Sequence, residues 1–466
     1  MNERADDNAK TLAAHPGTFP RVPRLGPHAV LGLGALLVLA AEWAYRRPGS
    51  VVWLLLEGLI AGAALLYAWR TQDRLRLAPV LALALAFHAA WIALHFGLDV
   101  TGDKDSSVVY RWQGNGLVNG NYPRSEYPLG AVLLFAFEAW VGGGSTKAAN
   151  AILMIPFQLA TVAAIWATRT TYAPWLAAFV ALWPLNAFSW EFKFDLVPAA
   201  LLAVGAVLAW RNRWALSGVV LGLGALVKWT PGLTAVVLVA WLLASRRGRD
   251  ALVHAGSFVA VVALAYVPFL AWNADHVLAA YTRQSGRSIT PESMWYLLLR
   301  PFDLARVRTH LSFAAGAPEW ADALAVVVQV ALLLALVLCA VFVRGRLRAA
   351  VALAVLAPAV FLLTNRIFSP QFVIVLFASW AVAAALVAGS RREQLAVGVA
   401  AALVSACNAF VYPFALPHYA VTWVICSAVL FAVAGALTTW LALRAATSAG
   451  SQPAGSAPPG RSPRPA

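Results

Sequence analysis

The sequence predicts an all-α polytopic membrane protein with about 12–14 transmembrane helices. Hydrophobic residues fill 61% of its 466 positions and charged residues only 12%, whereas a soluble domain carries roughly a quarter charged residues. The charged residues lie in short clusters between long apolar runs, without the charged outer stripe of a soluble helix. Together these observations exclude a soluble globular fold.

The apolar runs give the expected helices in chain order. A hydrocarbon core of roughly 30 Å takes about 20 apolar residues per crossing. The runs cover approximately residues 28–45, 51–69, 78–97, 149–168, 174–190, 195–210, 214–245, 252–272, 321–343, 349–364, 370–389, 395–411 and 419–443. Residues 28–443 therefore form the predicted membrane domain, and disordered cytoplasmic tails are expected at 1–27 and 444–466.

The run at 214–245 is too long for one ordinary membrane helix. Gly222, Lys228 and Pro231 interrupt its middle, and arginines flank both of its ends. Because basic flanks stay in the cytoplasm, both ends are expected on the same side of the membrane. The run is therefore predicted to form a hairpin of two short helices with residues 228–231 at its tip.

The distribution of basic residues predicts the orientation. With the N-terminus in the cytoplasm, most arginine clusters fall on the cytoplasmic side, as the positive-inside rule requires. These clusters are Arg70, Arg74 and Arg76; Arg169; Arg211 and Arg213; Arg246, Arg247 and Arg249; Arg344, Arg346 and Arg348; and Arg391 and Arg392. Arg46 and Arg47, on a short outer connection, count weakly against this arrangement. We expect a multi-pass plasma-membrane protein with both termini in the cytoplasm.

Two long segments then face outward, at about 98–147 and 273–319. Within the first, the stretch 129–141 is apolar but short, and it contains Glu138. We interpret it as an interfacial or half-inserted helix, because a full crossing there would invert every later helix.

The net charge of +15 would indicate nucleic acid as the partner of a soluble protein. Here the Lys and Arg residues lie at helix ends, where they set orientation and contact anionic lipid headgroups, so no nucleic acid partner is expected. The three cysteines have no disulfide or metal-site spacing, and no His and carboxylate set has ligand spacing. We expect no cofactor and no tightly bound metal, although a divalent ion stays open.

Acidic residues mark a candidate site in the first outer segment, where Asp99, Asp103 and Asp105 fall within seven residues. A carboxylate at the mouth of a membrane cavity can act as a general base on a hydroxyl nucleophile. The alternative is a solvated loop whose acids serve solubility.

Other polar residues converge on the same outer face if the topology holds: Glu191, Lys193, Asp195, Lys228, Asn365, Arg366, Ser369 and Gln371. Ionisable groups at membrane depth cost about 2.5–3.5 kcal/mol on insertion scales and usually mark a site. Lys228, between glycines and a proline, is the strongest of them. Its alternative is a lysine that extends to the headgroups.

Cations beside acids suit a lipid phosphate whose sugar is transferred at the membrane surface. Lys228, Arg366 and Lys193 would hold the phosphate leaving group, and an aspartate would deprotonate the acceptor hydroxyl. Aromatic side chains could stack on sugar rings or form an interfacial belt: Tyr110, Trp112, Tyr122 and Tyr127. No Gly-Lys-Ser/Thr phosphate loop is present, which favours a lipid-linked donor over a nucleotide sugar.

At these residues the chain resembles integral-membrane glycosyltransferases of the C superfamily, most closely family 87, the polyprenol-phosphate-mannose-dependent mannosyltransferases. Three stretches carry the resemblance: the acidic loop that closes on Glu126-Tyr127-Pro128, similar to the family's Asp…Tyr…Gly…Glu-Tyr-Pro-Pro pattern; residues 194–231, from Phe194-Asp195 through Lys228 to Pro231; and Phe368-Ser369-Pro370-Gln371-Phe372. They span most of the membrane domain.

The resemblance implies inverting transfer of a sugar, with mannose expected, from a polyprenyl phosphate to a cell-envelope lipid or glycan acceptor at the extracytoplasmic face. It implies a loop aspartate as base, and substrate-binding roles for Tyr110, Glu126, Tyr127, Asp195 and Gln371. The family's acid lies about four residues before the Tyr, where this chain has Ser106. Asp105 therefore ranks first as base and Asp103 second. Leu129 stands where the family has its second Pro, and the loop before Glu126 is shorter than is usual in the family. We therefore expect this chain to recognise its acceptor differently from other family members.

Two other functions stay open at this point. A transporter or lipid flippase would need ionisable groups near the bilayer midplane and internal repeats, and no clear repeat is found. A lipid-linked glycan polymerase or ligase would be favoured by a catalytic segment in the second outer loop that includes Arg283, Arg287 and Glu292.

Overall fold

The computed structural model describes residues 25–45, 51–98, 105–143, 145–186, 193–307, 315–411 and 421–447. This part of the chain is helical apart from one antiparallel pair of two-residue strands, β1 (Arg306–Val307) and β2 (Ala315–Gly316). Eight of its helices are long and apolar enough to cross a membrane, and five shorter apolar helices accompany them. The prediction of an all-α polytopic membrane protein is confirmed.

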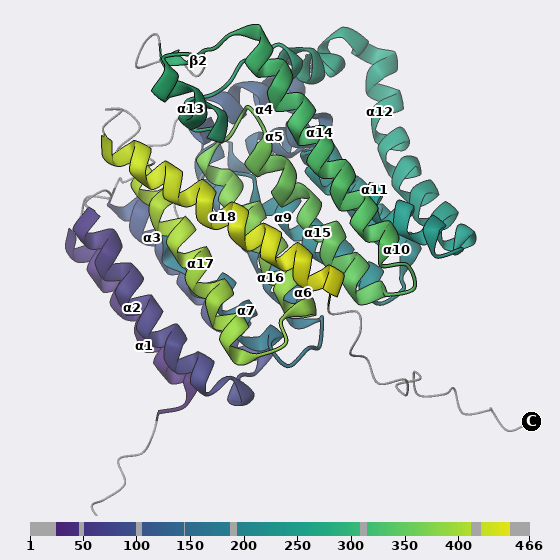
Figure 1. Ribbon diagram of the computed structural model, residues 1–466. Helices are drawn as coiled ribbons and strands as arrows, with labels where there is room; N and C mark the ends of the chain where they lie inside the picture. Colours follow the sequence, from purple (N-terminus) through teal and green to yellow (C-terminus); the bar gives the residue numbers. More distant parts are fainter. Residues whose placement is uncertain are drawn as a thin grey trace, which may run out of the picture.

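The most buried helices lie in the middle of the bundle (Figure 1): α9 (Leu196–Trp210), α15 (Leu347–Thr364) and α16 (Val373–Val387). Both α15 and α16 are rich in alanine, and almost every residue in them is buried. Small side chains let helix backbones approach closely in a membrane, where packing replaces the hydrophobic effect as the force between helices. These alanines therefore place α15 and α16 at the core.

Other helices surround this core (Figure 1). The N-terminal helices α1 (Pro27–Tyr45) and α2 (Val51–Arg70) form one edge with α3 (Leu77–Gly97) beside them, and α17 (Arg391–Ala409) and α18 (Val421–Thr447) pack against each other. The opposite edge holds α12 (Gly248–Ser285), and α14 (Glu319–Phe342) is also peripheral. Both peripheral helices expose apolar residues such as Leu264 and Val327, as lipid-facing helices do.

The long run at 214–245 forms two short helices, as predicted: α10 (Trp214–Val227) and α11 (Thr230–Ala244). Lys228 lies between them with an extended backbone (φ −154°, ψ 119°), and Pro231 falls in the first turn of α11. Proline fits a first turn because the amide hydrogen that it lacks would have no helical partner there. The break therefore sets the lysine at the junction of the two helices.

Three element boundaries differ clearly from the predicted ones. The predicted helix at 174–190 ends early as α7 (Ala173–Leu182), because Pro184 follows and the chain turns into the short 3₁₀ helix η3 (Pro184–Asn186). The predicted helix at 252–272 instead continues as α12 to Ser285 after a kink at Asn273 (φ −154°, ψ 77°). The second outer segment thus begins as helix rather than loop. At the C-terminal end, α18 extends to Thr447.

The outer segments carry the remaining short elements. The first contains η2 (Asp105–Val109), α4 (Tyr110–Val118) and α5 (Leu129–Gly142), and the second contains α13 (Met294–Leu299). At about 1.5 Å per residue, the 14-residue α5 is too short to cross a core of roughly 30 Å. Its short length agrees with the expectation of a half-inserted helix.

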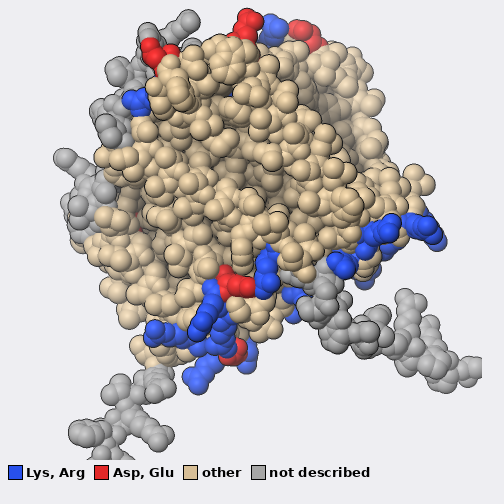
Figure 2. Space-filling model, in the orientation of Figure 1, with Lys and Arg blue, Asp and Glu red and all other residues tan. Residues whose placement is uncertain are grey.

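Charge is distributed unevenly over the surface (Figure 2). Lys and Arg side chains gather at the lower end of the molecule, a broad uncharged band follows, and the few charges at the upper end include several acids. The segments α4 and α13 lie at this upper end in Figure 1. An uncharged band between two charged ends is the surface expected of a membrane-spanning bundle.

Candidate active site

Two pairs of lysine and aspartate form the centre of the candidate site. Lys193 is hydrogen-bonded to Asp105, and Lys228 is hydrogen-bonded to Asp195. The four residues come from the start of η2, the start of α9 and the junction of α10 and α11. Segments that are distant in sequence therefore bring two aspartates and two lysines together in this site.

The local backbone explains why Asp195 and Lys228 meet. Asp195 precedes α9, yet its side chain makes no capping hydrogen bond and turns to Lys228 instead. Lys228 follows the last residue of α10. A carboxylate at a helix N-terminus and an ammonium at a helix C-terminus are both favoured by the helix dipoles. The N-terminus of α9 therefore stabilises Asp195, whereas Lys228 lies between the favourable C-terminus of α10 and the unfavourable N-terminus of α11 and depends on its partner.

The four side chains differ in their access to solvent. Asp195 is fully buried, Lys193 is 5% exposed, and the Lys228 side chain is 17% exposed. The Asp105 side chain is 40% exposed. Because a general base must be reached by the hydroxyl that it deprotonates, Asp105 is the more accessible of the two aspartates for such a role.

Aromatic rings pack against these pairs. The Tyr127 ring makes edge-on contacts with Tyr110, Phe135 and Phe194 at centroid distances of 5.4–5.9 Å. The Lys228 ammonium lies 5.4 Å from the ring centre of Phe194 and 4.2 Å from that of Phe372. An ammonium over an aromatic face gains about 0.5–2 kcal/mol depending on desolvation. The rings therefore help to hold a lysine in an otherwise apolar environment.

Tyr127 lies within electrostatic reach of both pairs. Burial raises the pKa of its phenol well above the ordinary value, and the charges of Glu126, Asp105 and Asp195 raise it further. The charge of Arg287 acts in the opposite direction and lowers it. Tyr127 is therefore neutral at physiological pH, with three acids and one arginine near its hydroxyl.

The stretch before α5 is fixed by local hydrogen bonds and close packing. The Ser125 hydroxyl accepts from the backbone N–H of Tyr127 at 2.8 Å and donates to the side chain of Gln113 at 2.6 Å. Gly114 of α4 packs directly on the backbone of Phe135, where an added Cβ would lie 2.1 Å from the carbonyl oxygen. A larger residue at this position would separate α4 from α5 and displace Tyr127.

The second outer segment joins this site to the stretch at 364–372. Gln284 donates to the carbonyl of Glu126 at 3.2 Å. A few residues later, Thr290 donates its N–H to the carbonyl of Arg366 at 2.9 Å and accepts from the N–H of Phe368 at 3.1 Å. Residues 284–290 therefore lie between the Glu126–Tyr127 stretch and the Phe368–Phe372 stretch.

Several predicted site residues meet, and others do not. The residues brought together are Asp105, Lys193, Asp195, Lys228, Tyr110, Glu126 and Tyr127. The side chain of Gln371 accepts a hydrogen bond from the Ser369 hydroxyl at 2.7 Å. Gln371 also precedes Phe372, whose ring contacts the Lys228 ammonium. Asp103 and Glu191 lie outside the described residues.

Arg366 has other partners than the two lysine pairs. Its guanidinium donates to the Ser285 carbonyl at 2.6 Å and lies 3.9 Å from the carboxylate of Asp322. The aromatic candidates also separate: Tyr122 packs on Phe269 and Trp272, and Trp112 is 61% exposed. Neither aromatic residue contacts the two pairs in the described part of the chain.

Three residues join the site without a sequence prediction for this role: Phe194, Phe372 and Arg287. Each phenylalanine is adjacent in sequence to a predicted site residue: Phe194 precedes Asp195, and Phe372 follows Gln371. That adjacency is the only sequence feature that could have indicated them. Arg287 was considered only for the polymerase or ligase alternative. So was Glu292, whose pKa burial raises to about 7 against the lowering effect of nearby Arg287. Arg283, the third residue of that set, is exposed.

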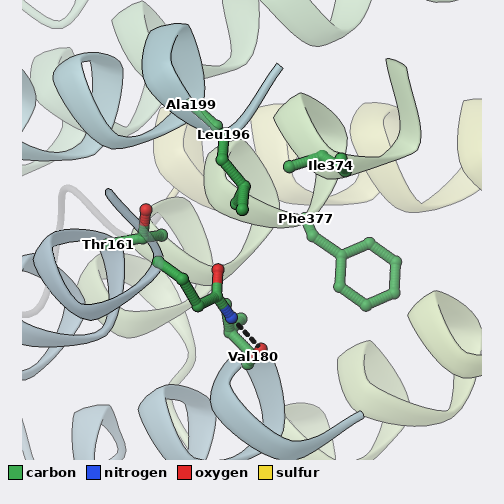
Figure 3. A pocket seen from close by; sticks show the side chains of 7 residues that line it. Thr161, Val180, Leu196, Ala199, Ile374 and Phe377 are labelled. Carbon is green, nitrogen blue, oxygen red and sulfur yellow. Dashed lines mark hydrogen bonds between the residues drawn. The ribbon is translucent and has the colours of Figure 1, made fainter. Parts of the chain in front are cut away.

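A small pocket lies inside the bundle, and one of the residues that line it is Leu196, which follows Asp195 in the chain (Figure 3). Its lining is mostly apolar: Gln158, Thr161, Val180, Leu196, Ala199, Ile374 and Phe377. The Gln158 amide already donates to the Val180 carbonyl at 2.8 Å. No Asp, Glu, His, Lys or Arg is among these lining residues. Within the described ranges, no group of three or more His, Cys, Asp or Glu residues is arranged to hold a metal ion.

Comparison with protein families gives one match. The profile described as Glycosyltransferase family 87 matches residues 126–370, just over half of the chain. The matched region contains Tyr127, both lysines of the site, Asp195 and Arg287, whereas Asp105 precedes it. Comparisons with curated proteins and with solved structures give no match.

Proposed function

The chain belongs to glycosyltransferase family 87 and is a multi-pass membrane glycosyltransferase, and we propose that it transfers a sugar from a polyprenyl-phosphate donor. The acceptor would be a lipid or glycan of the cell envelope, and mannose is the sugar we propose. The observation that carries the proposal is the meeting, beside Tyr127, of two aspartates that are each paired with a lysine, the more accessible of them being Asp105.

In the proposed reaction Asp105 is the general base. The acceptor hydroxyl oxygen attacks C1 of the donor sugar from the face opposite the phosphate, while the bond between C1 and the phosphate oxygen breaks. The electron pair of that bond goes to the phosphate, and the hydroxyl proton goes to the Asp105 carboxylate. The products are the glycosylated acceptor with inverted C1 and a polyprenyl phosphate.

The lysines would stabilise the charge that grows on the phosphate as this bond breaks. Preorganised cations in a site with little water contribute most where charge develops. Lys228 and Lys193 are held by aspartates and, for Lys228, by aromatic rings, so they need little rearrangement. Asp195 and Glu126 would orient these cations or the sugar hydroxyls, and Tyr127 and Gln371 would line the sugar site.

We also propose that the site faces the extracytoplasmic side of the plasma membrane. The gathering of Lys and Arg at the opposite end of the bundle supports this orientation, because basic residues favour the cytoplasmic side (Figures 1 and 2). A lipid-linked donor is the form of activated sugar expected on a side without nucleotide sugars.

The test is a donor screen with purified protein in nanodiscs. Transfer is measured from radiolabelled polyprenyl-phosphate sugars, with mannose among them, and from nucleotide sugars to an extract of envelope lipids. Wild type is expected to use a polyprenyl-phosphate sugar, and Asp105→Asn to lose at least about 100-fold in rate. Asp275→Asn, an exposed acid on the outer part of α12, is the matched control. Transfer from nucleotide sugars alone would overturn the proposed donor.

A lipid-linked glycan polymerase or ligase is the second candidate, because Arg287 and Glu292 of the second outer segment lie near the site. Such an enzyme transfers a preassembled glycan rather than one sugar. Mass spectrometry of the product separates the two: the proposed activity adds one hexose at a time, whereas a ligase adds an oligosaccharide in one step.

A further inference from the structure

Arg287 differs from Lys193, Lys228 and Arg366 because no carboxylate lies within ion-pair distance of it in the described part of the chain, although its charge acts on the carboxyl of Glu292. Lys193 and Lys228 are each paired with an aspartate, and Arg366 lies beside Asp322. Arg287 forms no ion pair with any residue that the structure describes; its guanidinium donates a 3.5 Å hydrogen bond to the side chain of Gln284. A phosphate that entered the site would have to compete with a hydrogen-bonded aspartate for each lysine, whereas at Arg287 it would compete only with the longer-range attraction of Glu292.

The position of Arg287 is set by the residues on either side of it. Gln284 accepts from the Arg287 guanidinium and donates to the Glu126 carbonyl, so it connects the arginine to the stretch that carries Tyr127. Three residues later, Thr290 is hydrogen-bonded to the backbone of Arg366 and Phe368. Arg287 is therefore held between the two stretches that border the site.

The charge of Arg287 acts on the same side chain, Tyr127, as the aspartates of the two lysine–aspartate pairs. Tyr127 lies within electrostatic reach of Asp105, Asp195 and Arg287. Arg287 is also partly buried, so solvent does not fully screen it. A planar guanidinium can bind two phosphate oxygens at once, which the single ammonium of a lysine cannot do.

From this geometry we propose that Arg287 is the principal ligand of the donor phosphate, with Gln284 as a positioning residue that aims its guanidinium. The assignment rests on the proposed function, because it takes a lipid-linked phosphate as the leaving group. Arg287 binds the phosphate in both ground and transition states, while Lys193 and Lys228 act on the charge that grows on it as the bond breaks.

The experiment measures binding of polyprenyl phosphate, the proposed product, by purified protein in nanodiscs of zwitterionic lipid. Tryptophan fluorescence reports binding, and polyprenol, which lacks the phosphate, is the reference ligand. Arg287→Gln is expected to weaken polyprenyl-phosphate binding by about 10–100-fold, the usual effect of losing a charge-assisted hydrogen bond. Binding of polyprenol is expected to stay unchanged. Inorganic phosphate is added as a competitor to show whether the lipid chain is needed.

Matched variants separate a phosphate contact from a general structural role. Arg283→Gln removes an exposed arginine in the last turn of α12, four residues earlier, and is expected to bind like wild type. Arg287→Lys keeps the positive charge but loses the planar guanidinium that can bind two phosphate oxygens, so binding of intermediate strength is expected. Gln284→Ala is expected to raise the donor KM severalfold with a smaller effect on kcat. Elution and thermal unfolding show that each variant is folded.

Two results would overturn the assignment, and they are distinguishable. If wild type binds polyprenyl phosphate and Arg287→Gln binds it equally well, Arg287 is not the phosphate ligand and the proposed function stands. If wild type does not discriminate polyprenyl phosphate from polyprenol, the proposed donor fails, and the assignment of Arg287 fails with it.

Discussion

The ammonium of Lys228 is hydrogen-bonded to the carboxylate of Asp195, a fully buried residue that precedes it by 33 positions in the chain. Neither charge would be stable in this apolar environment alone. An isolated buried charge costs several kcal/mol, and a well-placed partner offsets much of that cost. The pair therefore joins the start of α9 to the junction of α10 and α11.

Breaking this pair from one side is expected to be more damaging than removing both charges. Lys228→Met leaves Asp195 buried without a partner, and Asp195→Asn leaves Lys228 in the same position. Each change is expected to destabilise the protein by about 3–5 kcal/mol. The double variant is expected to recover part of this loss, as thermal unfolding in detergent would show, while transferase activity stays absent. Additive losses in the double variant would mean that the two residues do not stabilise each other.

Asp105 and Asp103 are expected to differ in their effect on the chemical step. The Asp105 side chain is 40% exposed and paired with Lys193, so Asp105→Asn removes the proposed base with little loss of packing. Its kcat is expected to fall at least about 100-fold, and the unfolding temperature is expected to fall as well, because the change takes a carboxylate away from the buried ammonium of Lys193. Asp103→Asn is the matched control and is expected to keep most activity. If both variants are fully active, neither aspartate is the base.

Glu292 is expected to make stability depend on pH. Burial raises the pKa of this carboxyl from 4.5 to about 7 in the folded protein. A hydrogen bond to Thr290 and the charge of Arg287 lower the pKa, but less than burial raises it. The folded state therefore binds more protons than the unfolded state between these two values. The contribution of Glu292 to stability is complete below about pH 4.5 and is lost as the pH rises to about 7.

Glu292→Gln tests this dependence because glutamine does not titrate. At pH 8 the variant is expected to be more stable than wild type by about 1–3 kcal/mol, and this difference is expected to disappear near pH 5. Thermal unfolding across this range measures it, with Glu319→Gln at the exposed start of α14 as the control. A difference that does not change with pH would contradict the raised pKa.

Gly114 is expected to be intolerant of even one additional carbon. A Cβ at this position would lie 2.1 Å from the Phe135 carbonyl oxygen, so α4 and α5 would have to separate. Gly114→Ala is expected to cost about 1–3 kcal/mol and to lower activity through displacement of Tyr110 and Tyr127. Gly256→Ala on α12, where an added Cβ meets nothing within 4 Å, is the matched control. Equal unfolding temperatures for the two variants would contradict this close approach.

Much of the fold could be predicted because its causes are local in sequence. The apolar runs predicted the helices, and the glycines and Pro231 around Lys228 predicted the break between α10 and α11. The kink at Asn273 and the outer half of α12 could not be predicted in the same way. There the chain is amphipathic, and the helix packs on residues near Tyr122 that are far away in sequence.

The sequence by itself determined that the protein is a helical membrane bundle, and it marked Asp105, Lys193, Asp195 and Lys228 as site candidates. It could do so because charge is costly in an apolar chain, so each retained charge stands out. Only the tertiary structure decided the partners: Lys228 with Asp195, Lys193 with Asp105, and Arg366 with Asp322. It also brought Phe372 and Arg287 to the site. These pairs depend on how separate helices pack against one another. Short stretches of sequence do not show that packing, so the partners could not be predicted from them.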